Sequence, residues 1–325
     1  MENQNMRAHL GRIAVLMGGI GEERNISLQS GESVADALKE AGAEVVCSDI
    51  RPTEMGILED ASIDVFFVAL HGRFGEDGQL QEIMEDKGLI YTGSGPEASR
   101  LAFDKMAGKE LFVDAGILTP EVIAVNPKTS AAELEKKLAG FSEKYVVKPT
   151  RQGSSVGIKI VDSPRAAAKA AKECIEEFGD CMVERFIAGK ELTVGVLCGE
   201  ALPIIEIRPR SNFYDYYAKY IDNGTEYLFD TISDSRLVAQ IQKEALKCFE
   251  ALGCRDFARV DFILSENGKC YALEVNNIPG FTSHSLLPKA AAKAGTGMSR
   301  LCTKIVEAAM ARKSDKTVGS RPPAI

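Results

Sequence analysis

The sequence predicts a protein of three segments: a parallel α/β unit followed by two α+β lobes built from antiparallel strands. Over the first 92 residues, apolar runs typical of strands alternate with helical patterns, which favours a parallel sheet. Val- and Ile-rich strands then follow, and the last strong signal is a β-hairpin. We place the segments at residues 1–97, 98–185 and 186–325 and expect the tail 313–325 to be disordered.

In the first segment, three apolar runs predict strands. RIAVLMGG and AEVVCSDI are the first two, separated by a helix over ISLQSGESVADALKEAG, and residues 64–70 are the third. A helix over 79–88 and a short strand over 89–92 follow. Ligands bind at the carboxyl ends of the strands in such sheets. We therefore expect the loops Gly18–Arg24 and His71–Gly78 to share one functional rim.

A single helix over 96–116 is predicted at the start of the second segment. The strands YVVKPT, GIKIV, CMVERFI and ELTVGVLC follow, with a helix over 163–178 among them. ALPIIEIRP, an irregular aromatic stretch at 212–230 and a helix over 233–252 lead to the hairpin. GSGPEA at 93–98 resembles a dinucleotide-binding fingerprint, but it follows only a four-residue strand, so we interpret it as a turn and a helix start.

Composition and charge exclude several classes of protein. The 325 residues are 45% hydrophobic and carry a net charge of −8. No Lys/Arg block stands out, so neither nucleic acid nor a membrane surface is an expected partner, and no apolar run is long enough for a membrane span. The N-terminus lacks the apolar core of a secretory signal, and the eight cysteines lack zinc or C-x-x-C spacing. We expect a cytoplasmic protein with buried free thiols.

The hairpin RVDFILSENGKCYALEVN gathers acidic and amide side chains on one face. We expect Asn267–Gly268 to form a two-residue type I′ turn, which sets Asp261 opposite Glu274 and Arg259 opposite Asn276 on one face. The opposite face is then a core face with three apolar couples: Val260 with Val275, Phe262 with Leu273, and Leu264 with Tyr271.

Two carboxylates that face each other across strands, with Cβ atoms roughly 4.5–5.5 Å apart, repel each other and need a cation. With Arg259 alone, the plain interpretation is a surface ion cluster. Three oxygen ligands in register, Asp261, Glu274 and Asn276, instead favour Mg²⁺, which usually takes one or two carboxylates together with substrate phosphates. The hairpin therefore predicts a magnesium–phosphate site.

KPTRQGSSVGIKIV supplies the expected phosphate-binding loop, since the chain has no P-loop motif. Lys148 ends a strand and offers a point charge. Glycines in the loop let backbone N–H groups approach an anion, and Ser154 and Ser155 add hydroxyl donors. A plain β-hairpin loop is the alternative for this segment taken alone.

Three further features are more ambiguous. Glu184 and Glu191 could bind an adenine amino group and ribose hydroxyls, although sequence alone favours solvated charges beside a strand. NFYDYYAKY is interpreted as a lid carrying a lysine and a tyrosine, with a core stripe as the alternative. His71 is either a satisfied rim histidine or a site residue, and His284 either packs a loop or joins the site.

These motifs, in this order, resemble the D-alanine–D-alanine ligases of the ATP-grasp superfamily. The resemblance runs from GGIGEERNISLQSG through HGRFGEDG, YTGSG, VVKPTRQGSSVG, VERFIAGKELTV and FYDYYAKY to RVDF and EVNNIPGFTSHSLLP. It implies a three-domain ATP-grasp fold that clasps ATP between the antiparallel sheets of two lobes. It also implies joining of two D-alanines through an acyl phosphate, for peptidoglycan precursor synthesis, by a cytoplasmic homodimer.

The resemblance also implies a role for each matching residue. ATP would be bound by Lys105, Lys148, Ser155, Glu184, Phe186, Ile187, Glu191 and Lys219. The substrates would be bound by His71, Ser285 and Leu286. The reaction would involve Glu23, Ser154, Tyr220, Arg259 and Gly280. Two Mg²⁺ or Mn²⁺ ions would be held by Asp261, Glu274 and Asn276.

The chain departs from the family pattern at three positions. Asn277 stands where the family usually has Thr, Gly21 where a small hydroxyl residue is common, and Tyr217 where an acidic residue is frequent. Tyr220 favours an amine as the second nucleophile, since relatives that use lactate generally lack this tyrosine. One alternative is an ATP-grasp carboxylate–amine ligase with a different second substrate. The other is a non-catalytic nucleotide-binding regulator, which would lack a metal or phosphate ligand.

Overall fold

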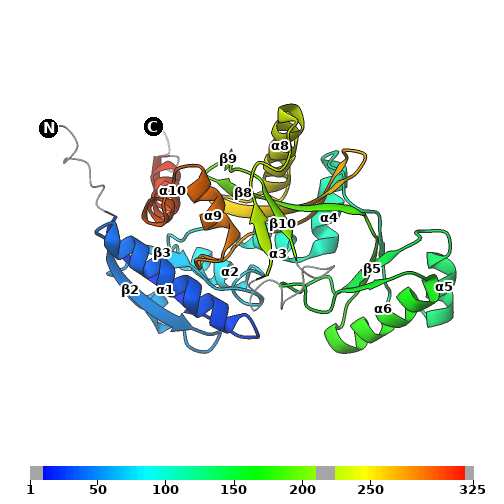
Figure 1. Cartoon of the computed structure of the whole chain (residues 1–325). Helices are drawn as coiled ribbons and strands as arrows, with labels where there is room; N and C mark the ends of the chain where they lie inside the picture. Colours follow the sequence, from blue (N-terminus) through cyan, green and yellow to red (C-terminus); the bar gives the residue numbers. More distant parts are fainter. Residues whose placement is uncertain (1–9, 210–223, 319–325) are drawn as a thin grey trace, which may run out of the picture.

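Three sheets organise the chain (Figure 1). The structure is a computed structural model that describes residues 10–209 and 224–318, with side chains as far as residue 312. The first sheet lies at the left of Figure 1 and the second at the right, with the third between and above them. The predicted combination of one parallel sheet with two antiparallel sheets is confirmed.

The first sheet is parallel, in the order β2-β1-β3. Its strands are β1 (Arg12–Gly18), β2 (Glu44–Ile50) and β3 (Val65–Val68). Every residue of β3 is buried, as in parallel strands covered on both faces. The accompanying helices are α1 (Arg24–Glu40), the 3-10 helix η1 (Gly56–Glu59) and α2 (Gln79–Asp86).

The strand predicted over 89–92 is wrong, because only Tyr91 pairs, in a single bridge with Phe66. The Thr92 hydroxyl accepts a hydrogen bond from the backbone N–H of Val68 at 3.0 Å. This side chain takes the place of a backbone carbonyl, so the ladder ends after one pair.

The single helix predicted over 96–116 is two helices, α3 (Pro96–Phe103) and α4 (Lys105–Asp114). Asp104 between them is extended, and its carboxylate accepts hydrogen bonds from Met106 N (3.1 Å) and Ala107 N (3.3 Å). An aspartate N-cap starts a new helix in this way. As a result, Lys105 occupies the first position of α4.

The second sheet is antiparallel, in the order β4-β7-β5-β6. Its strands are β4 (Val122–Ala124), β5 (Tyr145–Lys148), β6 (Lys159–Val161) and β7 (Met182–Arg185). Helices α5 (Ala131–Leu138) and α6 (Pro164–Phe178) share its core. Strand β4 and helix α5 were not predicted from the sequence. The latter carries a Ser130/Glu133 capping box, the signal that could have revealed it.

The third sheet has the order β11-β10-β8-β12-β13, with β9 paired to β8. Its strands are β8 (Gly189–Leu197), β9 (Glu200–Ala201), β10 (Ile205–Arg208), β11 (Glu226–Leu228), β12 (Phe257–Ser265) and β13 (Cys270–Asn276). Helix α8 (Ser235–Ala251) covers its apolar face. β11 corrects the prediction of an irregular stretch, since it pairs with β10 and forms the edge of the sheet.

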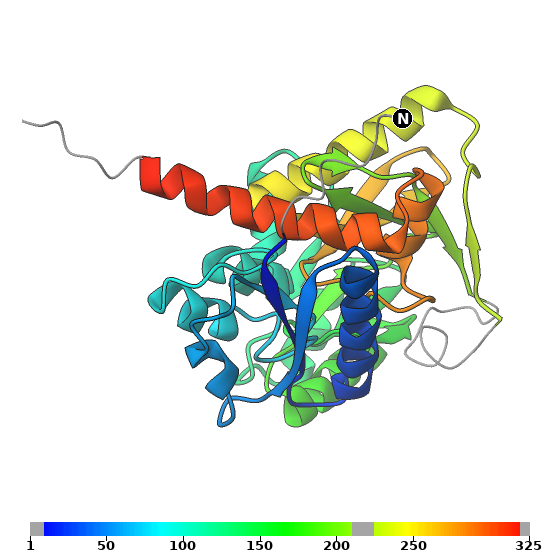
Figure 2. The ribbon, with the colours of Figure 1, turned by 90° about the vertical axis from the view of Figure 1, so that its left-hand side faces the viewer.

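Helices α9 (Leu286–Lys293) and α10 (Met298–Val318) complete the chain. Figure 2 shows α10 running across the molecule beside α1. The disorder expected from residue 313 stays a prediction; the backbone of α10 continues to Val318, and the helix contains no Gly or Pro. Residues 319–325 lie outside the described part.

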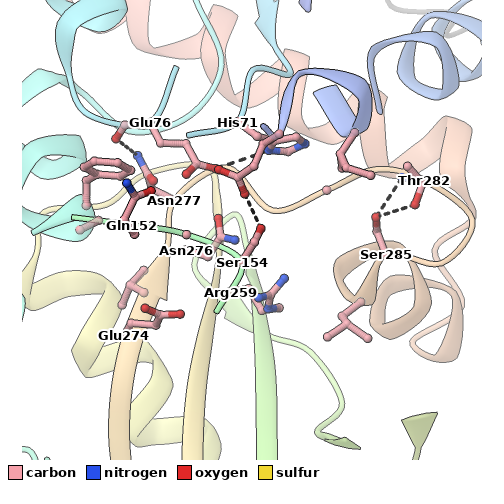
Figure 3. Close-up of a pocket in the computed structure, with 18 of the residues that line it drawn as sticks. His71, Glu76, Gln152, Ser154, Arg259, Glu274, Asn276, Asn277, Thr282 and Ser285 are labelled. Carbon is pink, nitrogen blue, oxygen red and sulfur yellow. Dashed lines mark hydrogen bonds and ion pairs between the residues drawn. The ribbon is translucent and has the colours of Figure 1, made fainter. Parts of the chain in front are cut away.

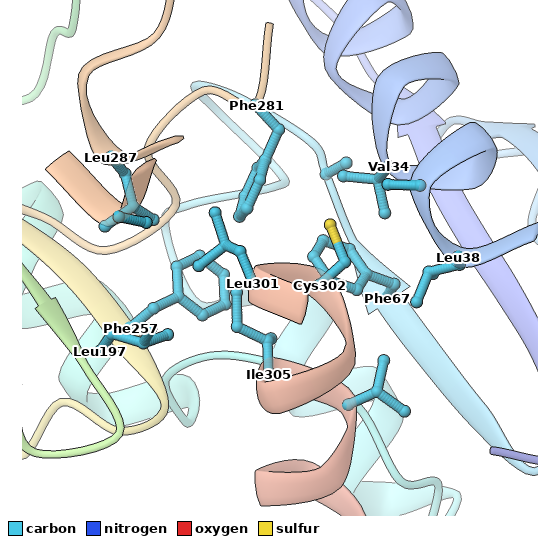
Figure 4. Close-up of a cluster of buried hydrophobic side chains, with 14 of the residues drawn as sticks. Val34, Leu38, Phe67, Leu197, Phe257, Phe281, Leu287, Leu301, Cys302 and Ile305 are labelled. Atoms are coloured by element: carbon cyan, nitrogen blue, oxygen red, sulfur yellow. The ribbon is translucent and has the colours of Figure 1, made fainter. Parts of the chain in front are cut away.

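One core joins the first and last parts of the chain (Figure 4). Phe67 of β3, Phe257 of β12 and Phe281 meet there. The ring centroid of Phe281 lies 5.4 Å from that of Phe67 and 5.5 Å from that of Phe257, both edge to face. Such pairs add to the free energy of burial. The parallel sheet and the third sheet are therefore packed together.

The segment boundaries at residues 97 and 185 stay predictions. Helices α3 and α4 contact β13, and Phe112 and Ile117 join the core beneath α8.

The expectation of buried thiols holds for five cysteines, whereas Cys47 and Cys198 are exposed and Cys270 is half-buried.

Replacing Phe257 with Ala should lower the free energy of unfolding by about 3–5 kcal/mol, because it opens a cavity where the two sheets meet. Urea unfolding would measure this. Val113→Ala removes methyl groups from a side chain that is 64% exposed and should change stability by less than about 0.5 kcal/mol. Equal effects of the two substitutions would contradict a shared core.

Candidate active site

The β12–β13 hairpin brings the predicted acidic residues together. Asp261 lies opposite Glu274, and Arg259 lies opposite Asn276, as the sequence predicted. Figure 3 shows Glu274 and Asn276 of β13 and Arg259 of β12 beside the same cavity. The facing of two carboxylates on one hairpin is therefore confirmed.

The predicted turn, however, is wrong. Of Asn267 and Gly268 only the glycine has positive φ (+78°), and the N–H of Ser265 bonds the carbonyl of Lys269 at 2.9 Å, which closes a three-residue loop. This loop shifts the pairing by one residue, and a β-bulge at Leu273 shifts it back before the carboxylates. Between turn and bulge the core face is therefore paired differently from the prediction: Phe262 with Ala272, and Leu264 with Cys270.

Each carboxylate of the facing pair has its own cation. Arg259 contacts Asp261 through Nε (3.0 Å to Oδ1) and Nη2 (3.1 Å to Oδ2). Lys105 Nζ lies 2.9 Å from Glu274 Oε2 and donates to the Gln152 carbonyl at 2.6 Å. Burial opposes the charge of Lys105, but the charge and hydrogen bond of Glu274 outweigh burial and raise the pKa of this lysine. The site therefore holds two negative and two positive side chains close together, with each carboxylate paired to one cation.

Two cavities adjoin the hairpin face. The larger cavity, of about 460 Å³, lies between the second and third sheets. The smaller cavity, of about 100 Å³, is walled by the first segment, the loop after β5 and the loop after β13. Three residues line both cavities: Lys105, Gln152 and Glu274. A group that passes between the cavities would meet the ammonium of Lys105.

The structure sorts the predicted site residues between these cavities. The larger cavity is lined by Lys105, Lys148, Ser155, Glu184, Phe186, Ile187 and Glu191, and by the carboxylates of Asp261 and Glu274. The smaller cavity is lined by Glu23, His71, Ser154, Arg259, Gly280, Ser285 and Leu286, and by Asn276 and His284. Lys219, Tyr220 and the departure Tyr217 lie outside the described residues.

The loop after Lys148 adopts an unfavourable backbone conformation beside both cavities. Ser154 (φ +53°) and Ser155 (φ +60°) are consecutive left-handed residues without being glycine, and such residues cluster at ligand-binding sites. The turn is closed by a 3.1 Å hydrogen bond from Val156 N to Gly153 O. Ser154 lines the smaller cavity, where its hydroxyl donates to Glu23 Oε1, and Ser155 lines the larger one.

Glu184 is almost fully buried between two lysines. Lys148 Nζ lies 2.8 Å from Oε2, and Lys109 Nζ lies 2.8 Å from Oε1. Burial alone would raise the pKa of Glu184, but the two ammonium groups outweigh burial and lower it. Lys109 was not among the site residues predicted from the sequence. Its only sequence signal is its position one helical turn after Lys105.

His71 is fixed by a network that the sequence analysis also missed. The backbone N–H of Phe281 donates to Ser30 Oγ at 3.2 Å, which leaves the Ser30 proton for His71 Nε2 at 3.1 Å. His71 Nδ1 lies 3.0 Å from the Ile278 carbonyl and must donate. The network thus assigns the proton of the neutral ring to Nδ1. Burial opposes charging, but Glu76, at 3.4 Å, outweighs it and raises the His71 pKa.

The loop after β13 is held on both sides. Asn277 is buried and donates from Nδ2 to the Glu76 carbonyl at 3.2 Å, so this departure from the family pattern ties the loop to the first segment. Ser285 Oγ accepts from Thr282 N at 3.0 Å. A Cβ at Gly280 would lie 2.6 Å from Ser285 Oγ, so any larger residue would have to displace this hydroxyl. At Gly21, φ is +98°, which explains a glycine in place of a hydroxyl residue.

Comparison with known proteins gives consistent matches. The family model described as "D-ala D-ala ligase C-terminus" matches residues 111–307. D-alanine–D-alanine ligases from Methylacidiphilum infernorum (42% identity over 91% of this chain and 94% of the relative) and Syntrophotalea carbinolica (43% over 93% and 97%) are similar in sequence. The crystal structure of D-alanine–D-alanine ligase from Bacillus anthracis has a TM-score of 0.82 at 33% identity and covers 94% of this chain and 99% of its own.

Two antiparallel sheets with a large cavity between them, beside a parallel α/β unit, define an ATP-grasp enzyme. A structure of the Bacillus anthracis ligase in complex with ATP has a TM-score of 0.81 at 32% identity, covering 94% of this chain and 99% of its own. The chain belongs to the D-alanine–D-alanine ligase family. The resemblance noted from the sequence motifs is thereby confirmed.

Ser30→Ala should lower the free energy of unfolding by about 1–3 kcal/mol, because it leaves the buried N–H of Phe281 without an acceptor. Amide hydrogen exchange at Phe281 should accelerate. Ser33→Ala on the same helix removes an exposed hydroxyl bonded only to the Gln29 carbonyl and serves as the control. Exchange at Phe281 that responds equally to both substitutions would rule out the proposed link between α1 and the loop.

Proposed function

We propose that the protein joins two D-alanine molecules to D-alanyl-D-alanine at the expense of ATP, for peptidoglycan precursor synthesis. The observation that carries the proposal is the shared wall of the two cavities: Lys105, Gln152 and Glu274. ATP occupies the larger cavity and the amino acids the smaller one. The terminal phosphate then lies at the junction, beside the ammonium of Lys105.

The first step transfers the γ-phosphate to the carboxylate of the first D-alanine, which yields an acyl phosphate and ADP. Positioning and charge neutralisation supply most of the catalysis in phosphoryl transfer. Lys105 and Lys148 neutralise phosphate oxygens from two sides. Glu23, held by Ser154, binds the ammonium group of the first D-alanine, with His71 in the same wall.

In the second step, the amine of the second D-alanine attacks the acyl carbon, and phosphate leaves from the tetrahedral intermediate. Arg259 and the backbone N–H of Gly280 stabilise the negative oxygen that develops. Ser285 and Leu286 bind the carboxylate of the second D-alanine, because the amino end of α9 attracts anions. Lys219 and Tyr220 are proposed to cover the bound substrates.

The donor set on the hairpin fits a divalent cation. Asp261, Glu274 and Asn276 present hard oxygens on adjacent strands, and each carboxylate is already held by a cationic side chain. Among the described residues, no three His, Cys, Asp or Glu side chains gather as a metal cluster, so phosphate oxygens and water must complete the coordination. Mg²⁺ or Mn²⁺ at these residues would neutralise the phosphates of ATP.

The family resemblance further implies a homodimer in the cytoplasm. Among the described residues, no helix is long and apolar enough to cross a membrane. Size-exclusion chromatography with light scattering tests the proposed dimer.

Phosphate release from ATP and Mg²⁺ should require D-alanine and should not occur with L-alanine, and mass spectrometry should identify D-alanyl-D-alanine. D-serine and D-lactate are the informative alternative acceptors. The D-Ala:D-Ser ligase VanG from Enterococcus faecalis shares the fold, with a TM-score of 0.80 at 28% identity. A product that contains D-serine or D-lactate would still support the proposed nucleotide site. It would change the proposed second substrate and the roles of the residues around Ser285. Absence of any release would favour a nucleotide-binding regulator.

Glu274→Gln should leave the circular dichroism spectrum unchanged and lower turnover by about a hundredfold or more, since it removes charge where the phosphate transfers. Steady-state phosphate release at saturating Mg²⁺ is the measurement. Glu266→Gln, at the exposed turn of the same hairpin, should retain full activity. Near-normal rates for Glu274→Gln would argue against the metal assignment.

A further inference from the structure

Two buried lysines share one buried carboxylate beneath the larger cavity. Lys109, Lys148 and Glu184 are 1%, 5% and 2% exposed. Both Nζ–carboxylate distances are 2.8 Å. Two ammonium groups facing one carboxylate leave this trio with one uncompensated positive charge when all three are ionised. A buried charge of this kind is costly unless something else compensates it.

The two lysines differ in what else they can reach. Lys148 lines the larger cavity, whereas Lys109 does not. Lys109 instead donates to Thr119 Oγ1 at 2.5 Å, and Thr119 donates to the Ala272 carbonyl of β13 at 2.8 Å. Lys109 is thereby fixed to the sheet from behind Glu184, while Lys148 faces the space in which an anion can bind.

The effect of Lys109 follows from its charge. A lone Lys148–Glu184 pair would be neutral, and an incoming phosphate would have to compete with the carboxylate for the ammonium group. With Lys109 in place, Glu184 keeps a cationic partner when Lys148 turns to the phosphate. The excess charge of the trio then becomes attraction for the polyphosphate.

We propose that Lys109 is a positioning residue for the nucleotide phosphates: it compensates Glu184 and so frees the ammonium of Lys148 for them. This inference rests on the proposed function in that the larger cavity holds ATP. Lys109 does not touch the nucleotide. The buried surroundings lower the pKa of Lys109, whereas the charge of Glu184 acts in the opposite direction.

The test is the ratio of the affinities for ADP and adenosine, measured by calorimetry at a fixed Mg²⁺ concentration. The wild type should bind ADP more tightly than adenosine. Lys109→Met should reduce this preference by about tenfold, the scale of one hydrogen bond to a charged group. Lys109→Arg keeps the charge and should retain most of the preference. A merely structural defect would lower the affinities for ADP and adenosine by similar factors and leave their ratio unchanged.

The control is Arg312→Met, which removes the half-buried partner of the buried carboxylate of Asp256, away from both cavities. It should lower stability and leave the affinity ratio unchanged. If Lys109→Met does not fold, Thr119→Val carries the test, because it removes the hydroxyl that fixes Lys109. The ratio should then fall in the same direction but by less.

The outcomes separate this inference from the proposed function. A wild type with no preference for ADP over adenosine would overturn the nucleotide site itself and the inference with it. A wild-type preference that survives in the tested variant, Lys109→Met or Thr119→Val, would overturn only the role of Lys109. Equal losses in Lys109→Met and Lys109→Arg would also overturn it, because charge would not be the cause.

Discussion

The facing pair of Asp261 and Glu274 is the constraint on which the rest of the site depends. Like charges directly opposite each other on neighbouring strands destabilise a sheet. A separate cation offsets this repulsion at each carboxylate: Arg259 pairs with Asp261, and Lys105 pairs with Glu274. Each cation also belongs to the wall of a cavity. The cations that stabilise the hairpin are thus also exposed to the two cavities, where the proposed function places phosphate and carboxylate oxygens.

The position of Lys105 shows how local backbone chemistry serves this arrangement. The Asp104 cap ends α3 and begins α4, so Lys105 lies at the start of a helix that packs on β13. One turn later, the same helix supplies Lys109 to Glu184. A single helix therefore provides cations to two acidic residues on two different sheets. In the larger cavity between those sheets, the lysines Lys105 and Lys148 are thus each paired with an acidic side chain of the same lining.

The smaller cavity depends on contacts between parts of the chain that are distant in sequence. Ser30 and His71 from the first segment hold the backbone of the loop after β13, and Asn277 returns the contact to Glu76. The aromatic cluster of Phe67, Phe257 and Phe281 holds the same loop from below. The loop that carries Gly280 and Ser285 is therefore positioned by both the parallel sheet and the third sheet.

The sequence by itself determined the order of most strands and helices, the facing of the two carboxylates and the family, and it predicted a phosphate-binding role for the loop after Lys148. Period-2 and period-3.6 patterns and ordered motifs are local, so they can be read without a fold. Only the tertiary structure decided the rest. The three-residue turn shifts the strand pairing by one residue, and the bulge at Leu273 shifts it back. No local sequence rule predicts either shift. Lys109 and Ser30 acquire their contacts from chain segments 75 and 251 residues away, because burial and charge compensation are set by packing between segments and not by neighbours in the chain.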